Sequence, residues 1–249
     1  MTATPAPHGD LPADERMREL AANLADVRER VRAACDQARR CIDDVTVVVV
    51  TKTFPAADVV RLVGLGVQQV AENRDQEAAA KVAEVTERLG GRRGPTWHFV
   101  GQLQRNKARS VARYADVVHS VDRVPLVAAL SAGAHAANRH LDVLVQVNLD
   151  PSATGRGGVP PADLPVVADA VAQSERLHLR GVMAVAPLGT DPRPAFDRLV
   201  ALAARLRDDH PEATWVSAGM SGDLEAAVQA GATHLRVGSA VLGSRPSLR

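Results

Sequence analysis

The chain has 249 residues, 46% of which are hydrophobic, and its 30 basic and 29 acidic side chains leave a formal net charge of +1. This balance provides no positive field for nucleic acid or an anionic membrane, and an aromatic content of 2% provides few surfaces on which single-stranded bases stack. We therefore expect neither nucleic acid nor a membrane as a partner, and the length suits one large α/β domain or two small ones.

The N-terminal segment 1–13 has neither the basic start nor the apolar stretch of a signal peptide, and no apolar run approaches the roughly 18 residues of a membrane span. We predict that this segment is a disordered leader and that the protein is cytoplasmic. The two cysteines, Cys35 and Cys41, are too few for a metal quartet and are expected to be reduced thiols. No spacing of histidines and carboxylates predicts a metal site.

The first regular element predicted is a helix that Asp14 caps. Its apolar residues recur at intervals of three and four, as on one face of an α-helix: Met17, Leu20, Leu24, Val27 and Val31. After it, runs typical of strands alternate with alanine- and arginine-rich stretches typical of helices. The strand-like runs are 45–52, 67–73, 97–102, 116–122, 142–148, 179–185, 214–220 and 233–239. The helical stretches are 56–65, 74–89, 103–113, 124–138, 161–176, 194–209 and 222–230.

This alternation predicts a parallel sheet with helical crossovers. Eight units in this length favour a single closed (β/α)8 barrel, the TIM-barrel architecture, over residues 14–249, with the first helix as an addition. An open, doubly wound sheet is the alternative. The sequence has no Gly-x-Gly-x-x-Gly motif after the first strand, which counts against a dinucleotide-binding version of that sheet.

Polar residues stand where the predicted strands end, and active sites of such barrels lie at the carboxyl ends of the strands. Reading those ends gives Lys52, Asn73, His98, Ser120, Asp122, Asn148, Met183, Ser217 and Arg236. Any one of them is explained equally well as a hydrogen-bonded polar group near the rim, but the whole set favours a site.

Lys52 is the most informative of these residues, because the chain has only three lysines, Lys52, Lys81 and Lys107, against 27 arginines. A lysine desolvated at a strand end has a lowered pKa and forms a Schiff base with an aldehyde, whereas arginine stays charged. The alternative is a lysine that extends to the barrel mouth. Lys81 is predicted to be an exposed helix residue. Lys107, with Arg105, is either solvated or attracts an anionic ligand.

Two turns resemble phosphate sites. In the segment 216–227 a strand ends at Ser217, and small residues lead into a helix that Ser221 or Gly222 opens; residues 236–239 repeat this after the last strand. Backbone N–H groups at such turns favour an anion, and the loops after strands seven and eight commonly hold phosphate in this barrel. Two ordinary glycine turns are the alternative reading. An amine facing a phosphate site suggests a phosphorylated aldehyde, either a sugar phosphate or pyridoxal 5′-phosphate (PLP).

Seven motifs in order then resemble the YggS/PROSC family of PLP homeostasis proteins, from about residue 20 to the C-terminus. They are "VVVVTKTFP" (47–55), "AENRDQE" (71–77), "WHFVGQLQRNK" (97–107), "HSVDR" (119–123), "QVN" (146–148), "SAGMSGD" (217–223) and "HLRVGSAVLGSR" (234–245). The resemblance implies the barrel of alanine racemase (fold type III of the PLP proteins) without its second domain.

The resemblance also implies roles for individual residues. Lys52 would hold PLP as a Schiff base, and Arg236 would face the pyridine nitrogen. Asn73 and His98 would line the pocket. The residues around the phosphate would be Ser217, Met220, Ser221, Gly238 and Ser239.

The chain departs from the family pattern at a few positions. Ala71 stands where the family usually has glycine, and "SAGMS" replaces the more usual "SMGMS". In the family the loop after "QVN" usually carries an acidic residue and a lysine, whereas the loop 149–160 here offers Arg156 and no nearby glutamate. The resemblance therefore implies no lysine-dependent role, such as a second PLP contact, for this loop.

Two main functions remain open, a PLP carrier acting in PLP homeostasis and a PLP-dependent amino-acid racemase. Arg236 favours the carrier, because a guanidinium only donates hydrogen bonds and leaves the pyridine unprotonated, which makes the ring a poorer electron sink. A racemase needs a second base, and Tyr114, the only tyrosine, falls late in a predicted outer helix; His98 and His119 are the nearest substitutes. A Schiff-base aldolase is a third reading. Expected partners are PLP and PLP-dependent apo-enzymes as recipients, and the expected state is a monomer or weak homodimer.

Overall fold

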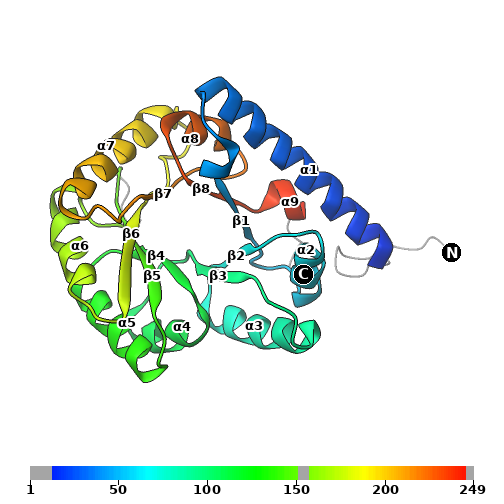
Figure 1. The fold of residues 1–249 in the computed structure, drawn as a ribbon, viewed down its shortest axis with the longest axis horizontal. Helices are drawn as coiled ribbons and strands as arrows, with labels where there is room; N and C mark the ends of the chain where they lie inside the picture. Colours follow the sequence, from blue (N-terminus) through cyan, green and yellow to red (C-terminus); the bar gives the residue numbers. More distant parts are fainter. Residues whose placement is uncertain (1–12, 151–156, 245–249) are drawn as a thin grey trace.

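The computed structural model describes residues 13–150 and 157–244, and within them eight parallel strands close into a barrel surrounded by helices (Figure 1). Each strand pairs with the next in sequence, and β1 pairs with β8 to close the sheet. The predicted (β/α)8 barrel is confirmed. The strands are β1 (Thr46–Val50), β2 (Gln69–Glu72), β3 (Thr96–Phe99), β4 (Val117–Val121), β5 (Leu141–Gln146), β6 (Leu177–Met183), β7 (Trp215–Ser217) and β8 (His234–Val237).

Helices surround the barrel, and all but the first and the last connect one strand to the next. They are α1 (Ala13–Ala38), α2 (Ala56–Gly64), α3 (Asp75–Leu89), α4 (Ala108–Tyr114), α5 (Val124–Ala136), α6 (Leu164–Ala172), α7 (Arg193–Asp209), α8 (Leu224–Ala230) and α9 (Ser239–Leu242). Short 3-10 turns lie at Ile42–Asp44, Arg105–Lys107 and Pro161–Asp163. Because α1 begins at Ala13, Asp14 is already helical, and the expectation that it caps the helix is wrong. Of the expected leader, residues 1–12 lie outside the described residues.

The valine run of β1 shows why these residues form a buried strand. Val48 and Val50 face the barrel interior, where they contact Ala71, while Val49 belongs to the larger apolar layer between sheet and helices. A strand of a parallel barrel is covered on both faces, so it needs apolar residues at consecutive positions. The run therefore fixes β1 in the wall of the barrel and places the next residues, which are polar, at its rim.

Helix α1 is an addition to the barrel that packs outside it against α8 and α9 (Figure 1). Arg16 anchors it: the guanidinium is buried, lies 2.8 Å from the buried carboxylate of Asp58 on α2, and donates to the carbonyl of Leu242. A buried pair of this kind is stable only when hydrogen bonds satisfy both groups, as they do here. No helix in the described part of the chain is both long and apolar enough to cross a membrane.

Candidate functional site

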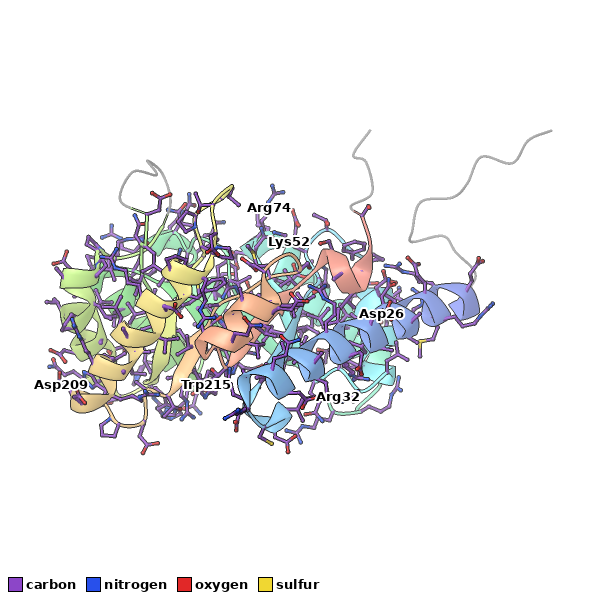
Figure 2. The ribbon with its side chains drawn as sticks, turned by 90° about the horizontal axis from the view of Figure 1, so that it is seen from above. Asp26, Arg32, Lys52, Arg74, Asp209 and Trp215 are labelled. Atoms are coloured by element: carbon purple, nitrogen blue, oxygen red, sulfur yellow. The ribbon has the colours of Figure 1, made fainter. Side chains whose placement is uncertain are left out.

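A cavity of about 480 Å³ opens at the carboxyl ends of the strands. Figure 2 shows Lys52 and Arg74 at this end of the molecule, with Trp215 and Asp209 toward the opposite end. The cavity is lined by Val50, Lys52, Thr53, Phe54, Asn73, Val100, Gly101, Gln102, Gln146, Met183, Val185, Met220, Ser221, Gly222, Arg236, Gly238, Ser239 and Gly243. Among these described residues, Lys52 and Arg236 are the ionisable ones.

Lys52 lies in a tight turn immediately after β1. The N–H of Thr51 donates to the carbonyl of Ala71, and the N–H of Phe54 donates to the carbonyl of Thr51. Thr53 has φ of +69°, a left-handed conformation that is rare for a β-branched residue. Such strain persists only where neighbouring contacts hold the backbone in place, and it is common at functional sites. The turn therefore holds Lys52 at the cavity wall.

Lys81 supplies one of those contacts, and the expectation that it is an exposed helix residue is wrong. It is only 9% exposed, and its Nζ lies 2.5 Å from Oε1 of the fully buried Glu72 and 2.8 Å from the carbonyl oxygen of Thr51. Thr51 Oγ1 also donates to Glu72 Oε1 at 2.7 Å. Lys81 thus ties α3 to the residue that precedes Lys52.

The two turns predicted to bind phosphate lie side by side at the cavity. The N–H of Ala240, after β8, donates to Ser221 Oγ, after β7, at 3.2 Å. Glycine is needed at position 219, because φ there is +87° and a Cβ would come within 2.5 Å of the Ala227 side chain. A Cβ on Gly222 would meet nothing within 4 Å, so this turn leaves open space.

Helix α1 holds both turns by hydrogen bonds from outside the barrel. Arg30 donates to the carbonyl of Ser221 at 3.0 Å while it pairs with Glu225 on α8. Asn23 donates to the carbonyl of Val241 on α9, also at 3.0 Å. The N-terminal helix is therefore part of the support of the site.

Arg236 forms part of the cavity floor. Burial lowers the pKa of its guanidinium to about 10, so it remains a cation at neutral pH. Its two Nη atoms donate to Ser217 Oγ at 2.7 Å and to the carbonyl of Ala184 at 2.9 Å, both neutral acceptors. Among the described residues no carboxylate forms an ion pair with Arg236, although the charge of Asp223 partly offsets the lowering of its pKa. A buried cation held by neutral acceptors favours an anionic or strongly accepting ligand in the cavity.

Most of the residues predicted for the site do line the cavity: Lys52, Asn73, Met220, Ser221, Arg236, Gly238 and Ser239. The structure places His98 and Ser217 elsewhere, in the barrel interior beneath the cavity, where both are buried. Asn148 accepts a bond from the N–H of Asp150 and is not part of the cavity lining.

Sequence reasoning missed several lining residues, among them Phe54, Val100, Gln102, Gln146 and Val185. Because β3 ends at Phe99, Val100 and Gln102 lie beyond the strand, and Val100 lines the cavity two positions after His98, the residue chosen. The same step of two separates Asn148 from Gln146. The rim therefore lies two positions after the chosen residue at β3 and two positions before it at β5, because the predicted strand ends differ from the real ones.

The buried histidines make stability depend on pH. Burial, and then the charge of His234, lowers the pKa of His98 to about 3; burial, and then Arg236, lowers that of His234 to about 4. The unfolded chain takes up these protons near pH 6.5. The free energy of unfolding is therefore largest above that pH and falls as the pH drops toward 3. We expect His98 alone to cost about 3 kcal/mol of unfolding free energy by pH 4.5.

Urea unfolding at pH 7 and pH 4.5 measures this loss, and His98→Gln serves as the comparison. The variant is expected to lose less stability between the two pH values than the wild type. Equal losses in both proteins would show that His98 titrates normally.

The fold and the cavity define a (β/α)8-barrel protein with a small-molecule site, lined by basic side chains, at the carboxyl ends of its strands. The family model described as the N-terminal domain of alanine racemase matches residues 22–246. Over 245 residues the chain is 44% identical to the pyridoxal phosphate homeostasis protein of Mycobacterium tuberculosis (strain ATCC 25618 / H37Rv), covering 93% of this chain and 95% of that protein. The chain belongs to this family of barrel proteins, within the group of pyridoxal phosphate homeostasis proteins.

Two further relatives agree with this placement. The protein of the same name from Escherichia coli (strain K12) is 37% identical over 232 residues, covering 92% of this chain and 98% of that protein. The PipY protein of Synechococcus elongatus PCC7942, solved with PLP bound, has a TM-score of 0.78 and 34% identity, with coverage of 90% and 100%.

Proposed function

We propose that this protein binds PLP as a Schiff base on Lys52 and acts in PLP homeostasis by storing and delivering the cofactor. The observation that carries the proposal is the cavity itself, in which a lysine and a buried arginine face two glycine- and serine-containing turns. An amine condenses with an aldehyde, with release of water, and the guanidinium charge favours an anionic ligand. No other aldehyde class explains both features together with the family.

The residues present fit PLP group by group. Ser221 and Ser239 offer hydroxyl groups for a phosphate, Gly222 leaves open space beside its backbone, and Gly238 lines the same cavity. Arg236 offers N–H donors to the acceptor nitrogen of the ring. PLP supplies an aldehyde and an electron-withdrawing ring, and a donor such as Arg236 leaves the ring nitrogen unprotonated.

The relatives support the same ligand. The curated relatives at 37–44% identity are named pyridoxal phosphate homeostasis proteins, and PipY has been solved with PLP. Their similarity extends over nine-tenths or more of this chain.

A carrier fits the cavity better than a racemase does. Racemisation needs a base on each face of the substrate carbon, and Lys52 is the one base among the described lining residues. Tyr114 lies on the outside of the barrel, where burial and then the nearby carboxylates Asp75 and Glu72 raise the pKa of its phenol. A tyrosine there does not serve as the second base. We propose PLP-dependent apo-enzymes as the recipients and a monomer or weak homodimer as the working state.

Borohydride reduction of the protein loaded with PLP, followed by peptide mass analysis, tests the Schiff base. We expect one pyridoxyl group per chain, on the peptide that contains Lys52. A label confined to Lys107 would contradict the proposal, because Lys107 lies outside the cavity lining and serves as the internal control.

The absence of catalysis needs its own measurement. The PLP-loaded protein is incubated with each L-amino acid, and the appearance of the D-enantiomer is followed. Turnover of about 1 per second or more, the range of ordinary enzymes, would replace the carrier by a racemase.

A further inference from the structure

A continuous chain of buried polar side chains runs beneath the cavity through the barrel interior. Arg236 Nη1 donates to Ser217 Oγ at 2.7 Å, and Ser217 Oγ lies 2.9 Å from His119 Nδ1. His119 Nε2 lies 2.7 Å from His98 Nδ1, and His98 Nε2 lies 2.7 Å from Gln69 Oε1. Five strands contribute one residue each, so the chain runs from the cavity floor to the start of β2.

The hydrogen bonds of this chain give every buried donor an acceptor only if all of them run in one direction. Ser217 is fully buried, and its hydroxyl has one hydrogen and two lone pairs. Arg236 occupies one lone pair. If His119 also donated to the hydroxyl, the Ser217 hydrogen would have no acceptor, since among the described residues its Oγ has no third hydrogen-bond partner.

Ser217 therefore donates to His119 Nδ1. His119 then donates from Nε2 to His98 Nδ1, and His98 donates from Nε2 to the amide oxygen of Gln69. Both histidines are neutral in this arrangement, and both carry their hydrogen on Nε2. The reverse direction would leave a buried hydroxyl unsatisfied, which is costly.

We propose that Ser217, His119, His98 and Gln69 form a one-directional hydrogen-bond chain that orients the Arg236 guanidinium at the floor of the cavity. Ser217 is then a positioning residue for Arg236 and not a phosphate ligand, because its single hydrogen is committed to His119. The consequence for the cofactor rests on the proposed function, in which Arg236 faces the PLP ring.

The surroundings favour neutral histidines. Burial lowers the pKa of His119 well below its usual value, and electrostatic interactions of its charged form with His98, Arg236 and His234 lower it further, in that order. Arg236 and His234 come from β8 and His98 from β3, and Ser217 is the neutral contact from β7. Since aligned hydrogen bonds polarise one another, Ser217 becomes a better acceptor for Arg236 than an isolated hydroxyl.

Nitrogen-15 NMR of the cofactor-free protein with labelled histidine tests the direction. Long-range proton–nitrogen correlations distinguish the two neutral tautomers, and His98→Gln and His119→Gln assign the signals. We expect both rings to carry hydrogen on Nε2 and to keep it there from pH 5 to 8. Hydrogen on Nδ1 of His119, or protonation of its ring at pH 6, would overturn the proposal.

The positioning role is tested on the Arg236 side chain, also without cofactor. In the wild type its guanidinium N–H groups are expected to give separate, slowly rotating NMR signals, because Ser217 and Ala184 hold them. Ser217→Ala should average these signals. The control is His234→Gln, another buried histidine of the interior that bonds to Thr233 and lies outside the chain, and it should leave them separate. Separate signals in Ser217→Ala would overturn the positioning role.

PLP binding then connects the chain to the cofactor. Ser217→Ala is expected to bind PLP about 10-fold more weakly, the loss of one charge-assisted hydrogen bond, and to shift the absorption band of the bound cofactor. His234→Gln should stay within about 2-fold of the wild type. Unchanged affinity and spectrum in Ser217→Ala would overturn the link to the cofactor. A wild type that binds no PLP would refute the proposed function. The two NMR experiments need no cofactor, so they would still test the hydrogen-bond chain.

Discussion

Lys52→Arg is expected to abolish the reducible attachment of PLP completely while the protein stays folded. Arginine keeps the positive charge and similar length, so electrostatic attraction of the phosphate remains, but a guanidinium forms no Schiff base with an aldehyde. Lys52 is only partly buried at the rim, so we expect the unfolding free energy to change by less than about 1 kcal/mol. Intact-mass analysis after borohydride reduction measures the attachment, and equilibrium dialysis measures the PLP that stays bound without it.

Because the chain has few lysines, few other amines compete with Lys52 in this experiment. The chain has only two other lysines, and Lys107→Arg is the matched control, with the same chemical change at a lysine outside the cavity lining. This control should keep one pyridoxyl group per chain. A full pyridoxyl group on Lys52→Arg, mapped to any other residue, would show that the amine at the end of β1 is not the attachment point.

Much of the fold follows from patterns within short stretches of sequence. Valine-rich runs alternate with helical stretches, and eight repeats of that unit in this length are enough to predict a barrel. The predicted strand at 142–148 corresponds to β5 at Leu141–Gln146, and every other strand also ends earlier than predicted. The polar residues after each run, such as Lys52, lie in the turns and not in the ladder, so composition extends the strands too far.

The lining of the cavity was predictable where a residue of an uncommon type stands at a strand end. Lys52 stands out because an amine ends an apolar strand in a chain that otherwise uses arginine. His98 was misplaced because whether a strand residue reaches the rim depends on the exact position at which the strand ends. The partners of His98 and Ser217 come from other strands, at sequence separations of 21 and 98 residues for the two bonds to His119, and no local pattern reveals them.

The burial of Lys81 was hidden for the same reason. Its neighbours in sequence are alanine, valine and glutamate, which suit an exposed helix, whereas its partners Glu72 and Thr51 come from β2 and the turn after β1. The structure makes Lys81 the tie between helix α3 and the turn that presents Lys52. A large effect on stability follows from this position.

Lys81→Met is expected to destabilise the fold by about 3–5 kcal/mol, because it leaves the fully buried carboxylate of Glu72 without its cation. Methionine has similar length and flexibility, so little packing is lost. The loss of unfolding free energy then comes from the unpaired charge of Glu72. PLP affinity should fall as well, since the Thr51 carbonyl loses the donor that ties it to α3 and keeps only the N–H of Phe54. Denaturant unfolding at pH 7, with the slope checked for two-state behaviour, measures the change.

The double variant Glu72→Gln/Lys81→Met separates the buried charge from the loss of the lysine itself. Removing both charges leaves no uncompensated ion in the wall between the sheet and α3, so the double variant should recover most of the stability lost by Lys81→Met alone. Lys107→Met provides the control, because Lys107 pairs with no buried carboxylate among the residues that the structure describes, and it should cost less than about 0.5 kcal/mol. If Lys81→Met costs no more than Lys107→Met, the pair does not hold the Lys52 turn. If the double variant is no more stable than Lys81→Met, the unpaired charge of Glu72 is not the cause of the loss.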